Sequence, residues 1–204
     1  MTFGDGTYDE YLRSVEAFHG TAAPGLLLGW HMVRLAAEHL PAESLVDVFC
    51  ETKACLPDAI QLLTPCSYGN GWLKVLDLGR FAAVFYDKHT GIGVRIHLDP
   101  ARLEPWDEVQ AWFLKRKRKD EQDANRLIGQ IHAAGTALFG VQPVQVPPQH
   151  RKKAKLGRVA LCPTCGESYP ESHGPTCRGC SQDLPYKPIE PGSPAPSIVP
   201  PERP

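Results

Sequence analysis

Apolar residues recur every three or four positions in four stretches of this chain, a pattern that predicts amphipathic helices. The second stretch begins near Pro24, a residue suited to the first turn of a helix. The fourth stretch ends at Gly140, and glycine commonly stops a helix. The expected helical faces are Tyr8, Leu12, Val15 and Phe18; Leu28, His31, Leu35 and His39; Trp106, Val109 and Phe113; and Leu127, Ile131, Ala134 and Leu138.

The middle of the chain has short apolar runs bounded by turn residues, which predict β-strands. Helices followed by mostly antiparallel strands and then further helices indicate an α+β domain, a mostly antiparallel sheet packed with helices, rather than a parallel sheet. The expected strands are 45–50, 72–76, 82–86 and 93–98, the last two forming a hairpin around Lys88-His89-Thr90-Gly91, with a short helix over 57–63.

Proline, glycine and basic residues mark the boundaries between the expected parts of the chain. The run Gln-Pro-Val-Gln-Val-Pro-Pro ends the first part, and a stretch rich in lysine and arginine follows it. The end of the chain is dominated by proline and serine, a composition typical of disordered segments. The expected parts are a core domain over 1–148, a basic linker over 149–158, a four-cysteine module over 159–187 and a disordered tail over 188–204.

Four cysteines form two Cys-x-x-Cys pairs separated by eleven residues: Cys162, Cys165, Cys177 and Cys180. This spacing can bring four thiolates to one tetrahedral ion, and zinc is its usual occupant. The sequence between the pairs is rich in glycine and proline and cannot build a packed core, so metal binding would fold it. The alternative is a pair of disulfides. A closed four-cysteine site is normally structural.

Composition describes an ordinary soluble globular protein. The chain has 204 residues, a hydrophobic content of 42% and a net charge of −1. Near-neutral charge argues against bulk electrostatic binding to nucleic acid. The N-terminus lacks the apolar region of a secretory signal, and no run approaches the ~20 apolar residues that span a bilayer. Seven cysteines, an odd number, fit free thiols or metal ligands in a reducing cytoplasm.

Side chains capable of chemistry in the first part lie at the ends of elements. His19 stands between the first two expected helices. Cys55 lies at a helix start, where a thiolate is stabilised, and Asp58 follows in the first turn. Cys66 lies in the glycine-rich loop 64–71. Each also has a structural interpretation, Asp58 most simply as a helix cap.

The same loops carry a longer, irregular pattern. It comprises His19-Gly20, Pro24-Gly25, Glu51-Thr52, Cys55, Asp58-Ala59-Ile60-Gln61, Thr64, Cys66, Gly69, Leu73, Asp77, Gly79, Thr90-Gly91 and Val94-Arg95. With it the chain resembles the E-subunit family of formylmethanofuran dehydrogenase over roughly residues 10–140. The resemblance extends to the tail, because many members of that family carry a C-terminal treble-clef zinc finger.

The resemblance implies an accessory protein of molybdenum- or tungsten-linked redox metabolism, with a redox enzyme subunit or a small ligand as its partner. It also implies a core cleft that binds a metal or a small ligand. The family's second histidine is Thr21 here, its cysteine before Pro-Gly is Ala23, and Pro65 replaces a glycine. The groups left for a core site are His19, Cys55, Asp58 and Cys66. A homodimer fits an α+β domain with a hairpin at its edge.

Two other functions stay open at this point. A zinc-finger adaptor for nucleic acid or protein could use the basic linker and the run Lys115-Arg116-Lys117-Arg118-Lys119, with a degenerate core site. The simpler interpretation of that run is a solvated helical face, since it lacks the interleaved aromatics that stack on bases. Alternatively, Cys55 could act as a nucleophile with His19 as its base. Whether the chain is an enzyme is therefore left open.

Overall fold

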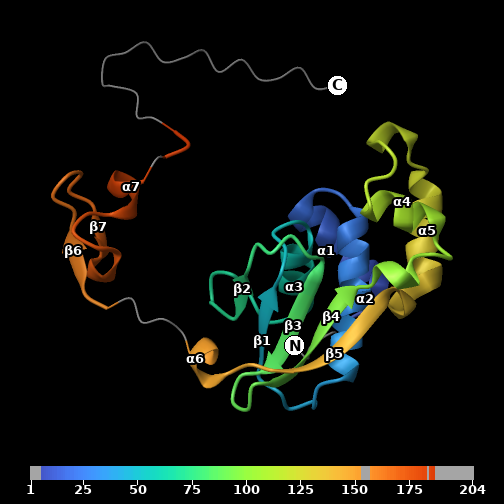
Figure 1. Cartoon of the computed structure of the whole chain (residues 1–204), viewed down its shortest axis with the longest axis horizontal. Coiled ribbons are helices and arrows are strands. Elements are labelled where there is room, and N and C mark those ends of the chain that lie inside the picture. Colours follow the sequence, from blue (N-terminus) through green and yellow to red (C-terminus); the bar gives the residue numbers. More distant parts are fainter. Residues whose placement is uncertain (1–5, 153–156, 183, 187–204) are drawn as a thin grey trace, which may run out of the picture. The chain divides into compact units, whose positions relative to one another are not determined.

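The chain divides into two compact units, Met1–Lys153 and Ala154–Pro204. The computed structural model describes residues 6–152, 157–182 and 184–186, drawn as ribbons in Figure 1. The predicted disordered tail over 188–204, and part of the predicted linker, lie outside the described residues. No helix in the described part of the chain is long and apolar enough to cross a membrane.

The first unit contains a five-stranded sheet in the order β2-β1-β3-β4-β5. β1 and β2 are parallel, and the other three pairings are antiparallel. The predicted α+β class, with a mostly antiparallel sheet, is therefore confirmed. The strands are β1 (Val46–Cys50), β2 (Leu73–Val75), β3 (Ala82–Asp87), β4 (Ile92–Leu98) and β5 (Phe139–Gln145).

Helices cover one face of this sheet (Figure 1). α2 contacts β4, α3 contacts β2, and α1 packs on both of these helices; α5 packs on α2, and α4 on α5. The helices are α1 (Tyr8–His19), α2 (Pro24–Glu38), α3 (Leu56–Leu63), α4 (Asp107–Phe113), α5 (Ala124–Ala134) and α6 (Pro148–Arg151). Short 3-10 turns occur at Pro100–Arg102, Lys119–Glu121 and Gly135–Leu138.

The core lies between that sheet face and the helices. Val48, Phe85 and Val94 are aligned across three neighbouring strands and are all buried. Because strand side chains alternate between faces, this register sends one apolar row toward α2 and α3. Phe18 was expected on the apolar face of α1, but its side chain is 56% exposed, so that expectation is wrong.

β5 differs from expectation. The sequence predicts a helix through Leu138 that stops at Gly140, whereas α5 ends at Ala134 and Gly135 takes a positive φ of 53°. The chain then turns and pairs with β4 over seven positions. Pro143 weakens a strand signal, but it is tolerated because β5 is the last strand of the sheet.

The first residues of the predicted linker are ordered against the first unit. α6 extends to Arg151, which donates to the carbonyl of His89. Lys74 Nζ donates to the carbonyl of His150 over 2.9 Å. The backbone N–H of Val146 also donates to Gly91 in the β3–β4 turn. The chain leaving the sheet is thus held on this turn as far as Arg151.

The second unit is small. It contains an antiparallel hairpin of β6 (Val159–Leu161) and β7 (Ser168–Pro170), a 3-10 turn at Glu171–His173 and the short helix α7 (Arg178–Ser181). Its few large buried side chains include Tyr169, whose hydroxyl donates to the Gly174 carbonyl over 3.0 Å.

Candidate functional site

The first Cys-x-x-Cys pair lies in the turn that joins β6 to β7. The backbone N–H of Cys162 donates to the carbonyl of Glu167, and the N–H of Gly166 donates back to the carbonyl of Cys162. Gly166 has a φ of 77°, a left-handed conformation that glycine adopts without strain. These bonds fold the turn so that Cys162 and Cys165 face the same side.

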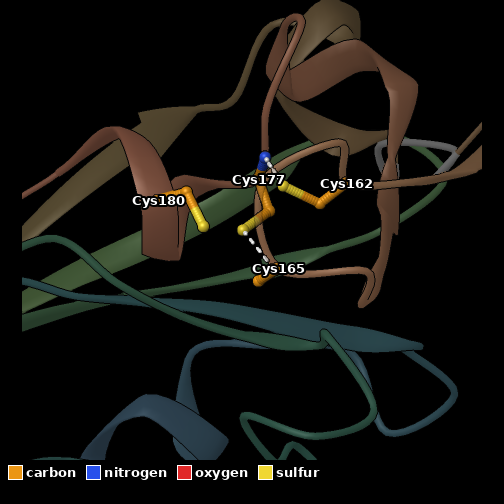
Figure 2. A group of neighbouring side chains, drawn as sticks. All are labelled: Cys162, Cys165, Cys177 and Cys180. Carbon is orange, nitrogen blue, oxygen red and sulfur yellow. Dashed lines mark hydrogen bonds between the residues drawn. The ribbon is translucent and has the colours of Figure 1, made fainter. Parts of the chain in front are cut away.

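The second pair starts α7, and it brings its sulfurs to the first pair (Figure 2). The four ligand sulfurs all lie within 4.8 Å of one another. Cys165 Sγ and Cys177 Sγ are 3.7 Å apart. Four sulfurs bound to one tetrahedral zinc ion at about 2.3 Å would be about 3.8 Å apart, so the donor set fits zinc.

The surroundings of Cys162 favour its thiolate, which is the form that binds metal. The backbone N–H of Cys177 donates to Cys162 Sγ over 3.4 Å. This bond is the largest cause, ahead of the amide of Cys165, that lowers the pKa of the Cys162 thiol to about 6. All seven cysteines of the chain are free thiols in the structure, with no disulfide among them.

In the first unit, the structure brings His19 and Asp58 together. His19 Nδ1 and Asp58 Oδ2 are 2.7 Å apart, and both side chains are partly buried. His19 is the last residue of α1, and Asp58 is in the first turn of α3. A negative side chain at a helix start and a basic one at a helix end both suit the helix dipoles. The pair therefore ties two helix ends together.

Cys55 stands beside this pair at the start of α3. Its backbone has φ 53° and ψ −48°, and the N–H of Leu56 donates to the carbonyl of Ala54 across it. That is a γ-turn of the rare, strained form. Burial raises the pKa of the Cys55 thiol, the charge of Asp58 adds to this, and Lys115 opposes it. The thiol is thus neutral at pH 7.

Cys66 does not join this group. Its side chain is completely buried, and its thiol donates to the carbonyl of Val46 over 3.1 Å. Burial raises the pKa of Cys66 to about 11. Within the described residues, the four sulfurs of the second unit form the single group of three or more potential metal ligands at such short separations. His19, Cys55 and Asp58 are neighbours but are not gathered as tightly as that.

The basic run after α4 is largely engaged within the first unit. Three consecutive basic side chains of the run each contact an oxygen of the same unit. The contacts are Arg116 with Gln110, Lys117 with Glu108, and Arg118 with Asp120. Glu108 is buried, so its contact with Lys117 is part of the packing of this segment.

Two residues of the Cys55 surroundings were not predicted as functional. A Cβ built on Gly25 would lie 2.8 Å from Cys55 Cβ, so only glycine lets the start of α2 approach this closely. Lys115 follows α4 and acts on Cys55 through its charge. No local pattern distinguishes Lys115 from its basic neighbours, because its proximity to Cys55 arises from the packing of α4.

The fold and the sulfur cluster define a class: an α+β body followed by a treble-clef zinc-finger module. Residues 18–146 match the family described as "FmdE, Molybdenum formylmethanofuran dehydrogenase operon". Residues 153–187 match the "FmdE treble clef zinc finger". The chain belongs to the FmdE family, as its loops indicated.

Two relatives illustrate this membership. A crystal structure of a tungsten formylmethanofuran dehydrogenase E-subunit (FmdE)-like protein from Syntrophus aciditrophicus is 44% identical, with a TM-score of 0.82. The similarity covers 92% of this chain and 100% of that one. A "Probable S-adenosyl-L-methionine-binding protein" of Archaeoglobus fulgidus is 30% identical over 176 residues, covering 76% of this chain. The match covers 47% of that relative's own length.

Proposed function

We propose that this chain is a zinc-binding accessory protein of molybdenum- or tungsten-linked redox metabolism. The finger holds one structural zinc ion through Cys162, Cys165, Cys177 and Cys180. The observation that carries this proposal is the cluster of four sulfurs within 4.8 Å of one another, in a segment that matches a treble-clef family. Zinc would fix the β6–β7 turn to α7, which share few apolar contacts of their own. Such a site requires reduced thiols, so we place the protein in the cytoplasm.

The body contributes a small-ligand site at the His19–Asp58 pair and Cys55. The pair and the thiol converge from two helix ends, at least partly open to solvent. The printed name of the Archaeoglobus relative makes S-adenosyl-L-methionine one ligand to test. The redox link is proposed from family membership and from the printed name of the Syntrophus protein.

Metal content of the full chain tests both parts. We expect one zinc per chain, lost in Cys177→Ser and retained in Cys55→Ser. Zinc retained in Cys177→Ser would contradict the structural site. A second metal equivalent that disappears in Cys55→Ser would mean that the body binds a metal rather than an organic ligand.

We further propose that the protein forms a homodimer and docks on a redox enzyme subunit. Light scattering measures the first, and co-elution with a purified molybdenum or tungsten formylmethanofuran dehydrogenase measures the second. A monomer at all concentrations would remove the dimer. The adaptor alternative is less favoured, because the basic run is engaged in intramolecular contacts. Salt-sensitive binding of RNA or DNA by the full chain would reinstate it.

A further inference from the structure

Two residues in the described part of the chain combine a side chain with a left-handed backbone, and they belong to the same site. Cys55 has a φ of 53° and Lys115 a φ of 54°; every other described residue with a positive φ is glycine. A β-carbon makes this conformation unfavourable by about 1–3 kcal/mol. Lys115 lies just after α4, at the position where glycine usually ends a helix.

Packing places the end of α4 beside Cys55. Cys55 and Phe81 both lie against the position that a Cβ on Gly25 would take, with Phe81 Cε2 3.6 Å from it. The Phe81 ring in turn contacts that of Phe113 edge to face, with centroids 6.5 Å apart. Lys115 follows two residues later, and its charge lowers the pKa of the Cys55 thiol against the larger effect of burial.

Lys115 is the unbalanced charge at this opening. The other charged side chains nearby are paired with one another: His19 with Asp58, Lys53 with Asp77, and Arg80 with Glu51. Lys115 forms no ion pair with any carboxylate among the described residues, and its Nζ lies over the Trp112 ring, 5.4 Å from the centroid. An unpaired ammonium attracts an anion and repels a divalent cation.

We propose that the opening between Cys55 and Lys115 binds the anionic end, a carboxylate or similar oxyanion, of a small organic molecule. Lys115 supplies the counter-charge. Phe18 and Leu114, which are 56% and 39% exposed, adjoin His19 and Lys115 in the chain and offer apolar surface for the rest of that molecule. The inference rests on the proposed function, since it specifies the ligand class of the same site.

Alkylation of Cys55 by two reagents of similar size tests the charge. Iodoacetate is anionic and iodoacetamide is neutral, and both react with the thiolate, so the ratio of their rates cancels changes in thiol pKa. The ratio is measured by mass spectrometry of the Cys55 peptide from the zinc-loaded full chain. We expect it to exceed the ratio for N-acetylcysteine. It should fall about fivefold in Lys115→Met, as for an exposed charge pair, and hold in Lys115→Arg.

Arg116→Met is the matched control, because it removes one charge from the neighbouring residue, which contacts Gln110 instead. Its ratio should stay at the wild-type value. Lys115→Gly separates binding from structure: it relieves the left-handed strain, so it should raise Tm while lowering the ratio. A higher Tm with an unchanged ratio, or a wild-type ratio equal to that of N-acetylcysteine, would overturn the proposal.

A protection measurement distinguishes this failure from failure of the site itself. Acetate, the probe, should slow alkylation by iodoacetamide in the wild type but not in Lys115→Met. Protection by zinc that is equal in both proteins would overturn the anion assignment while retaining a ligand site in the body. No protection of Cys55 by acetate, zinc or S-adenosyl-L-methionine would overturn both.

Discussion

Gly29 of α2 lies directly against Ala59 of α3, with no room for a β-carbon between the two helices. A Cβ built on Gly29 would overlap the Cβ of Ala59 and would lie 3.5 Å from Leu56 Cδ1. This close approach places the first turn of α3, with Cys55 and Asp58, beside the start of α2. The position of the proposed ligand site therefore depends on a glycine with no chemistry of its own.

Gly29→Ala should destabilise the first unit. The added methyl group must push α2 and α3 apart, and overpacking of this kind costs about 1–3 kcal/mol. Urea unfolding followed by circular dichroism measures the change. Gly129→Ala in α5 is the matched control, since nothing lies within 4 Å of its Cβ position. It should stabilise the helix by about 0.5–1 kcal/mol. Equal stabilisation by both variants would refute the close packing.

Glu51 is a second sensitive position. Its buried carboxylate accepts two hydrogen bonds of 2.8 Å from Arg95 and an ion pair from Arg80. The hydrogen bonds from Arg95 are the largest cause that lowers the pKa of Glu51 below its usual value of 4.5. Because the folded-state pKa is depressed, the stabilisation is fully present above pH 4.5 and is lost as the pH falls through the folded-state pKa.

Glu51→Gln should therefore lower the free energy of unfolding by about 2 kcal/mol at pH 7. The difference from the wild type should shrink as the pH falls below 4.5, which urea unfolding at several pH values measures. The control is Asp77→Asn, which breaks an exposed ion pair with Lys53 and should change stability little. A deficit of Glu51→Gln that is independent of pH would contradict the electrostatic account.

The three thiols of the first unit should differ in reactivity. Cys50 and Cys66 are completely buried, and burial raises the pKa of each to about 11. At pH 8 roughly one such thiol in a thousand is ionised. Iodoacetamide should label Cys55 first in the zinc-loaded protein, yet more slowly than a free thiol because its pKa is raised too. Peptide mapping measures this order, and labelling of Cys66 as fast as Cys55 would contradict the structure.

Removal of zinc should unfold the second unit alone. The turn at Cys162 and Gly166 has few apolar contacts to hold it without the metal, whereas the first unit has its own core. After chelation, the amide of Gly166 should lose protection from hydrogen exchange, and amides of β3 should keep theirs. Acid should act like a chelator, because protons compete with the metal for the thiolates. Persistent protection at Gly166 would show that the module folds without metal.

The sequence predicted the elements whose signals are local. The helices at Tyr8 and Pro24 and the β3–β4 hairpin follow from periodicity and turn residues, which each short segment carries by itself. β5 was missed because its seven residues contain Pro143 and few apolar positions. It becomes a strand by pairing with β4, a partner about forty residues away, which no local pattern reveals.

For the sites, the sequence alone determined the four-cysteine cluster, because two short Cys-x-x-Cys turns fix most of the geometry of a metal site before any packing occurs. It also identified the residues His19, Cys55 and Asp58, but not their arrangement. Only the tertiary structure decided that Cys66 points into the core, that Gly25 admits Cys55 and that Lys115 reaches the same opening. Those relations depend on how α2, α3 and α4 pack, and packing joins side chains whose separation along the chain carries no signal.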